Sequence, residues 1–185
     1  SPRRRALLIA EPLALALGYS VGMNFGQTLP HETLAPGNDG TLFGLMSAGG
    51  LIASPLAGWM ADRLGPKCSV AGAAAFNGFG FLLMALGGSP ATILAGAFLC
   101  GAGYYGATAA LVAAAGTSSS SESAGTFLAR QQSALDMGMI AGGLLSGSMM
   151  QTGLSVSDVC LATSAIIGTS LVIWSMMYPN EKGTS

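Results

Sequence analysis

Six long apolar runs, separated by short polar or turn-forming segments, dominate the pattern of this 185-residue chain. Each run is long enough to cross a hydrocarbon core as a helix, which takes roughly 20 residues. Glycine, proline and serine interrupt the runs, as in Gly65-Pro66 and Gly87-Gly88-Ser89-Pro90. The pattern predicts an all-helical membrane protein with spans near residues 6–30, 41–61, 68–88, 91–115, 126–150 and 157–178.

The composition favours the same class. Hydrophobic residues make up 51% of the chain and charged residues 8%, and the mean hydropathy is +0.58. Soluble domains carry roughly 25% charged residues. The 28 glycines favour helices that approach one another closely through small residues. We therefore expect a lipid bilayer around the chain, and neither a cofactor, a metal cluster nor a nucleic acid as a partner.

The positive charges test this threading separately. Alternate loops of a six-span chain lie on opposite sides of the membrane, and every lysine and arginine falls on one of these sides. They are Arg3, Arg4, Arg5, Arg63, Lys67, Arg130 and Lys182. By the positive-inside rule this side is cytoplasmic, so both termini are expected in the cytoplasm, at a plasma or inner membrane.

The most distinctive motif is a charged turn between the second and third runs, Gly58-Trp59-Met60-Ala61-Asp62-Arg63-Leu64-Gly65-Pro66-Lys67. Its glycines allow two helix ends to approach, and Asp62 and Arg63 are able to hydrogen-bond helix ends and each other. A looser echo, Gly147-x-x-x-Gln151-x-Gly153, follows the fifth run on the opposite membrane face. This placement suggests an inverted repeat of three helices plus three.

The segment from Gly58 to Lys67 resembles the signature loop of the major facilitator superfamily, Gly-x-x-x-Asp-Arg/Lys-x-Gly-x-Arg/Lys. Gly18-Tyr19, Leu56-Ala57-Gly58 and Asp136-Met137-Gly138 look like its drug and metabolite efflux branch. The resemblance implies one six-helix half of a twelve-helix secondary transporter. The fourth span lacks an arginine and the fifth looks like an eleventh helix, which implies the carboxy-terminal half.

Under this resemblance, the chain is expected to be a fragment whose amino-terminal transporter half is missing. Two positions depart from the family pattern. Gly142-Gly143 stands where the antiporter signature usually has Gly-Pro, and Ser54 replaces an arginine often seen before the second-span proline.

The resemblance also implies a cytoplasmic gate that closes one face of the transporter and then releases it. Its members would be Gly58, Asp62, Arg63, Gly65, Lys67 and Arg130, with Glu122 as a further charge partner. The alternative is a static surface ion pair, worth about 0–1 kcal/mol.

Besides Asp158 at the start of the last span, two acidic residues lie inside predicted spans. Asp136 sits well within the fifth span, where a carboxylate must be paired, protonated or in contact with water, so it is a candidate for proton coupling or substrate contact. The alternative is a structural acid that is hydrogen-bonded to a neighbouring helix. Glu11 is either a second candidate or a side chain that reaches the membrane surface to pair with the arginine tail.

The family geometry places the first and fourth helices of a half along the central cavity. Asn24 and Gln27 on the first span and Tyr104 and Tyr105 on the fourth are therefore candidates for holding a small-molecule substrate. Three glycines of the fifth span are expected to allow close helix packing, in particular against the missing half. They are Gly138, Gly142 and Gly147.

Together with the resemblance, these observations predict half of a secondary transporter that moves a small solute by alternating access, with proton-coupled efflux as a candidate mode. The alternative is a non-transporting six-helix module that binds a partner subunit. An intramembrane hydrolase is disfavoured because the single histidine, His31, lies in a loop and no nucleophile with a base is evident. The chain is therefore not expected to be an enzyme.

Overall fold

A computed structural model describes residues 2–26, 39–116 and 124–178, and these residues form six helices. The all-helical fold that the apolar pattern predicts is confirmed, and each helix lies close to one predicted span. The helices are α1 Pro2–Gly26, α3 Asp39–Leu64, α4 Pro66–Leu86, α5 Pro90–Gly116, α6 Ala124–Gln151 and α7 Val156–Met177.

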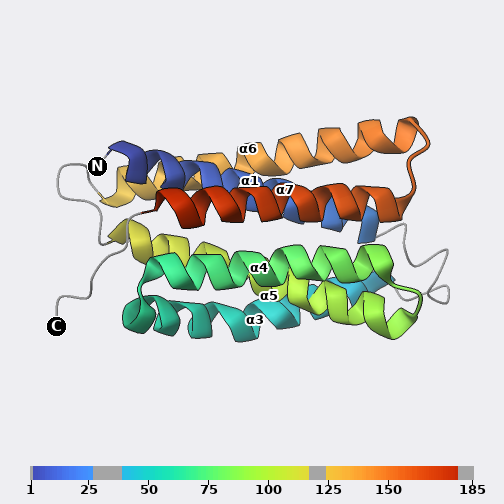
Figure 1. Ribbon diagram of the computed structural model, residues 1–185, viewed down its shortest axis with the longest axis horizontal. Helices are drawn as coiled ribbons and strands as arrows, with labels where there is room; N and C mark the ends of the chain where they lie inside the picture. The colour runs from blue at the N-terminus through green and yellow to red at the C-terminus, as the bar shows by residue number, and fades with distance from the viewer. Residues whose placement is uncertain (1, 27–38, 117–123, 179–185) are drawn as a thin grey trace.

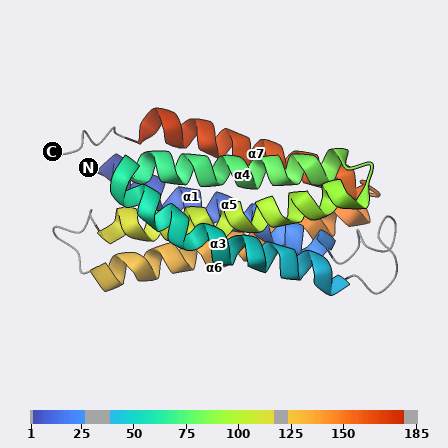
Figure 2. The ribbon, with the colours of Figure 1, turned by 90° about the horizontal axis from the view of Figure 1, so that it is seen from below.

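The helices run lengthwise, side by side, in a single bundle (Figure 1). Helix α1 packs against α6 and α7, whereas α5 packs against α3 and α4, and α4 joins the two groups by packing against α7. Figure 2 shows α1 and α5 as a middle layer between α4 and α7 on one side and α3 and α6 on the other. The two central helices are therefore flanked by α3 and α6.

Local chemistry sets several helix ends. Gly65 separates α3 from α4 with φ 84° and ψ 154°, a conformation that essentially only glycine adopts, and Pro66 opens α4 at a position that suits its fixed φ. Helix α7 begins with a capping box, in which Ser155 Oγ accepts from the Asp158 amide and the Asp158 carboxylate accepts from the Ser155 amide. Neither end depends on distant contacts.

Glycines allow two helix pairs to approach closely. A Cβ atom at Gly138 or Gly142 would meet the backbone oxygens of Leu13 or Leu17, so these two glycines of α6 lie directly against α1. The expectation that they face a missing half is wrong, since they pack within the chain. Gly147, in contrast, has no neighbour within 4 Å of such an atom.

Close approach at glycines also joins α3 to α5. A Cβ atom at Gly49 would meet the backbone of Phe98, and one at Gly101 would meet the backbone of Met46. At Gly58 the space around such an atom is open, so this glycine does not bring two helix ends of this chain together as the motif suggested. The outer helices α3 and α6 thus each lie against one central helix through small residues.

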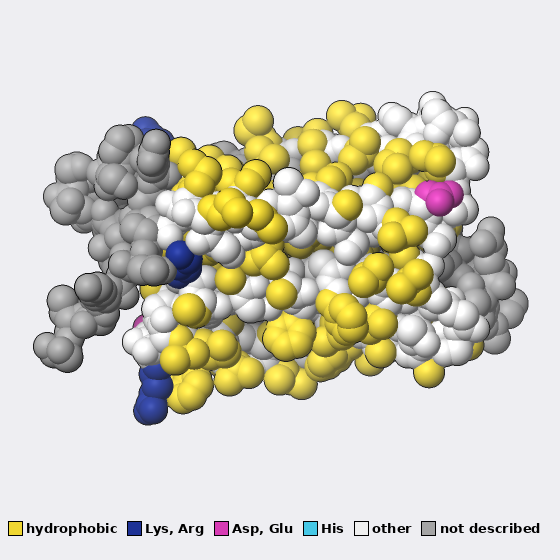
Figure 3. Space-filling model, in the orientation of Figure 1, with side chains coloured by type: hydrophobic (Ala, Val, Ile, Leu, Met, Phe, Trp, Pro, Cys, Tyr) yellow, Lys and Arg dark blue, Asp and Glu magenta, His cyan; other side chains and the backbone are white. Residues whose placement is uncertain are grey.

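The outer surface suits a bilayer. Leu51 and Met176 are 80% and 81% exposed, and apolar side chains cover the length of the face in Figure 3, with lysines and arginines at one end and an acidic group at the other. Five helices are long and apolar enough to cross a membrane, namely α1, α3, α4, α5 and α7. The remaining helix, α6, is equally long, but it carries Arg130, Gln131, Gln132 and Asp136.

Candidate functional site

Three tyrosines meet where α1 runs beside α5. The rings of Tyr19 and Tyr104 stack with centroids 4.0 Å apart, and Tyr105 lies edge-on to both, at 5.6 Å from Tyr19 and 5.1 Å from Tyr104. The hydroxyl oxygens of Tyr19 and Tyr105 are 3.0 Å apart and share a hydrogen bond. Aromatic faces and hydroxyls together can bind an apolar body and a polar group of one ligand.

The structure thus brings together the predicted residues Tyr104 and Tyr105 and adds Tyr19, which the sequence reasoning did not select. The chain has four tyrosines. A tyrosine on the first helix could have been noticed, because the family geometry sets this helix beside the fourth.

A cavity of about 480 Å³ opens beside this tyrosine cluster, between α3 and α5. Tyr105 forms one wall, and Ser47, Ser54 and Pro55 of α3 form the other. The Ser54 hydroxyl donates to the Gly50 carbonyl at 2.8 Å, so it is partly occupied within its own helix. The cavity therefore offers an aromatic wall opposite a weakly polar one.

Helix α6, which packs against α1, carries a polar stripe that includes Gln132 and Asp136. Gln132 Nε2 donates to Asp136 Oδ1 at 3.0 Å, and both side chains are exposed. The Asp136 carboxylate also interacts electrostatically with the phenol of Tyr104. This predicted candidate is therefore exposed on the surface of the bundle, close enough to Tyr104 for an electrostatic interaction.

Glu11 lies elsewhere. Its side chain is 4% exposed and accepts a hydrogen bond from Ser170 Oγ at 3.3 Å, so it is enclosed between α1 and α7 and does not extend to the membrane surface. Tyr19 follows it by eight residues, about 12 Å along the helix. Glu11 is thus separate from the tyrosine cluster.

Asn24 lies at the seam between α1 and α6. Its Nδ2 atom donates to Ser146 Oγ at 3.2 Å, and one turn earlier Ser20 Oγ donates to the Met139 carbonyl at 2.7 Å. These bonds hold α6 on α1, which gives Asn24 a structural role in this arrangement. The other polar candidate of the first span, Gln27, lies outside the described residues, as does Glu122.

The signature loop lies at the end of the bundle where α3 ends and α4 begins (Figure 1). Asp62 and Arg63 are exposed, and the Arg63 guanidinium lies over the Trp59 ring, 4.9 Å from its centroid. Lys67 begins α4 at the same end, and Arg130 lies in the second turn of α6, which also starts there. The structure therefore gathers the predicted gate residues at one end of the bundle.

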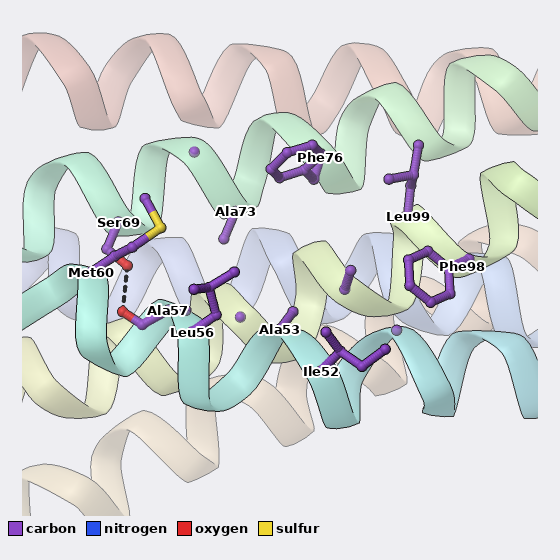
Figure 4. Close-up of a pocket in the computed structure, with 14 residues that line it drawn as sticks. Ile52, Ala53, Leu56, Ala57, Met60, Ser69, Ala73, Phe76, Phe98 and Leu99 are labelled. Atoms are coloured by element: carbon purple, nitrogen blue, oxygen red, sulfur yellow. Dashed lines mark hydrogen bonds between the residues drawn. The ribbon is translucent and has the colours of Figure 1, made fainter.

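A further pocket of about 280 Å³ lies between α3, α4 and α5 and is almost wholly apolar (Figure 4). Ile52, Leu56, Phe76 and Phe98 are among its walls. Its one hydroxyl, that of Ser69, donates to the Ala57 carbonyl at 2.7 Å. This pocket therefore has no polar group with which to select a ligand.

Metal chemistry has no evident place in the part of the chain that the structure describes, where no three His, Cys, Asp or Glu side chains gather to hold an ion.

Comparison with known proteins agrees with this architecture. The sequence matches the family described as Major Facilitator Superfamily over residues 7–185. A search of curated proteins found no match. Members of this family are membrane transporters of small molecules and not enzymes, in agreement with the expectation from the sequence. With nearly its whole length matched, the chain belongs to the Major Facilitator Superfamily.

Proposed function

We propose that this chain forms one six-helix half of a secondary transporter, which moves a small solute by alternating access. The main support for the proposal is the tyrosine cluster of Tyr19, Tyr104 and Tyr105. It combines three aromatic rings with a hydrogen bond between two hydroxyls, beside an open cavity. Aromatic surfaces with a few polar groups are typical of small-molecule sites. The solute lies against these rings, between α3 and α6.

The outer helices supply the contact with a second half. Among the described residues, nothing lies within 4 Å of a Cβ atom added at Gly44 or Gly58 on α3 or at Gly147 on α6. Small residues let membrane helices approach closely, so these open positions suit helices from outside this chain. The remaining half of a twelve-helix transporter would cover them.

Helix pairing supports an inverted repeat of three helices plus three. In such a repeat, α1 corresponds to α5, α3 to α6 and α4 to α7. Under this correspondence, the observed pairing of α1 with α6 is equivalent to the observed pairing of α5 with α3. The pairing of α1 with α7 is likewise equivalent to that of α5 with α4, and α4 stays beside α7. Two equivalent groups around one site are the arrangement through which such transporters rock.

The charged end of the bundle is the cytoplasmic one in this proposal. Arg63, Lys67 and Arg130 lie at this end, where α1 begins and α7 finishes (Figure 1). Both termini are then cytoplasmic by the positive-inside rule. The signature loop at this end acts as the gate, with Gly65 as its turn and Arg63 moving on or off Trp59.

Proton-coupled efflux is the mode that we assign to this half. Asp136 is the coupling residue in this proposal, because it is a carboxylate within a predicted span and is hydrogen-bonded by Gln132 on α6. Intramembrane carboxylates that face a water-filled cavity serve as proton relays in transporters. Enclosed Glu11 helps to hold α7 on α1 instead.

Cysteine accessibility in membrane vesicles tests alternating access. In a background without Cys68, Cys100 and Cys160, we expect Ser54→Cys to react with a membrane-impermeant maleimide from either side, because the cavity opens to each in turn. The control is Ile52→Cys, on the same helix but in the apolar pocket of Figure 4, which should react from neither side. Reaction of Ser54→Cys from one side only would contradict alternating access.

A further inference from the structure

A small pocket between α1, α5 and α6 has a polar floor. Its volume is about 130 Å³, and its walls include Pro12, Thr108, Val112, Leu128, Gln131 and Gln132. Val112 and Leu128 are 47% and 39% exposed, so they stand at the mouth, whereas Pro12 and Gln131 are buried behind them. A group that enters between α5 and α6 therefore reaches Gln131.

Gln131 holds an acceptor that nothing in this part of the molecule uses. The side chain is 4% exposed, and its Nε2 atom donates to the carbonyls of Leu8 at 3.1 Å and Leu111 at 3.4 Å. Two acceptors fix the amide with its nitrogen toward them, which leaves Oε1 on the other side. Oε1 has no hydrogen-bond partner among the described residues. A buried acceptor without a donor costs free energy, so a ligand that brings a donor gains affinity.

A second buried amide, that of Asn77, differs from Gln131 in that it lines no pocket described here. Its Oδ1 atom is the other buried side-chain oxygen without a partner in the described chain, but it is fully enclosed between α4 and α5, where Nδ2 donates to the Cys100 carbonyl at 3.2 Å. Of these two side chains, only that of Gln131 borders a pocket described here.

The pocket lies next to the tyrosine cluster. Thr108, in its wall, is one helical turn from Tyr104, and its hydroxyl donates to the Tyr104 carbonyl at 2.8 Å. Gln132, also in the wall, donates to Asp136. The Thr108 hydroxyl hydrogen is thus used within α5, and the pocket-lining side chain whose acceptor lacks a donor among the described residues is Gln131. Arg130 precedes Gln131 but points about 100° away around the helix.

We infer that this pocket binds a hydrogen-bond-donating head group of the transported solute, an ammonium or a hydroxyl, with Gln131 Oε1 as its acceptor and the solute body against the tyrosines. This inference rests on the proposed transport function, since it assigns the polar end of the same site. A carboxylate head is excluded because it would set acceptor against acceptor.

Three probes with one ring and different heads test the inference: benzylamine, which is an ammonium at neutral pH, benzyl alcohol and benzoate. Binding to the purified intact protein in detergent is measured at equilibrium by saturation-transfer NMR. We expect benzylamine and benzyl alcohol to bind and benzoate to bind at least about tenfold more weakly, as loss of one hydrogen bond to a charged group predicts. If benzylamine binds more tightly than benzyl alcohol, the head group of the solute is an ammonium. If benzyl alcohol binds more tightly, the head group is a hydroxyl.

Two variants locate the binding. Gln131→Met removes the acceptor oxygen. Val112→Phe fills the mouth of the pocket but leaves the hydrogen bonds of Gln131 intact. If Gln131→Met does not fold, Val112→Phe alone tests whether the probes bind in this pocket. Each variant should weaken both donor probes at least about tenfold. The matched control, Ile52→Phe in the apolar pocket, should leave binding unchanged.

Equal binding of benzoate, or unchanged binding in Val112→Phe, overturns the inference. Because binding is measured without a gradient, its outcome is independent of the maleimide test of alternating access.

Discussion

The hydroxyls of Tyr19 and Tyr105, 3.0 Å apart, join α1 directly to α5. These two helices form the middle layer of the bundle (Figure 2), and each carries its own group of flanking helices. The bond therefore links the two groups at the point where Tyr105 faces the cavity. The cavity itself is lined by α3 and α5, and the bond connects its Tyr105 wall to α1 of the other group.

The first prediction concerns this bond. Tyr19→Phe and Tyr105→Phe each remove one of the two hydroxyl oxygens and keep the ring. Because either change alone breaks the hydrogen bond, the double variant should lose the stability of this one bond only once. We expect a coupling energy of about 0.6 kcal/mol, the average for hydrogen bonds between membrane helices. It is measured by a double-mutant cycle of unfolding in mixed detergent micelles. Strictly additive single effects would show that the hydroxyls do not interact.

The second prediction compares a glycine of α6 with one of α7. Gly142→Ala places a methyl group against the backbone of Leu17 and should lower the free energy of unfolding by about 1–3 kcal/mol, the usual cost of overpacking. Gly168→Ala, on α7 with nothing among the described residues within 4 Å of the added methyl group, is the control and should fold normally. Thermal unfolding of the purified variants measures the difference. Equal stability of the two variants would mean that α6 does not lie on α1 in this register.

A third prediction concerns the turn of the signature loop. Gly65→Ala forces a side chain into a backbone conformation with φ 84°, which costs about 1–3 kcal/mol. Gly72→Ala, in helix α4 with nothing among the described residues within 4 Å of the added methyl group, is the control and should fold normally. We expect Gly65→Ala to lower the thermal stability of the purified protein relative to Gly72→Ala. A stable Gly65→Ala would show that the turn readily takes another shape.

The fourth prediction separates the two interior acids. For a solute that the native protein transports, Asp136→Asn should abolish acceleration by an imposed pH gradient but retain solute exchange, because the variant lacks the carboxyl group that we propose for coupling. Glu11→Gln keeps an oxygen for the Ser170 hydroxyl and should respond to the gradient like the native protein. Transport into proteoliposomes with and without the gradient measures both effects. If only Glu11→Gln loses the response, Glu11 is the coupling residue and Asp136 is not.

Helix positions could be read from the sequence because they depend on local properties. Runs of about 20 apolar residues between turn-forming residues predict membrane helices wherever they occur, and α3 and α4 are separated at Gly65 as the motif indicates. The family could also be recognised from the sequence, because the residues of the signature loop from Gly58 to Lys67 form one continuous segment. The gathering of Arg63, Lys67 and Arg130 at one end follows from the same alternation of spans.

The partner of each helix face was decided by tertiary packing. Glycine, alanine and larger apolar residues occur all around these helices, so the pattern alone does not tell which side of α6 meets α1 or that Tyr19 stacks on Tyr104. The same limit hid the enclosure of Glu11 by α7 and the free oxygen of Gln131. In a bilayer, lipid and protein interior are equally apolar, so the hydrophobic pattern specifies that a helix spans the membrane, whereas close contacts between small residues and a few hydrogen bonds specify its neighbours.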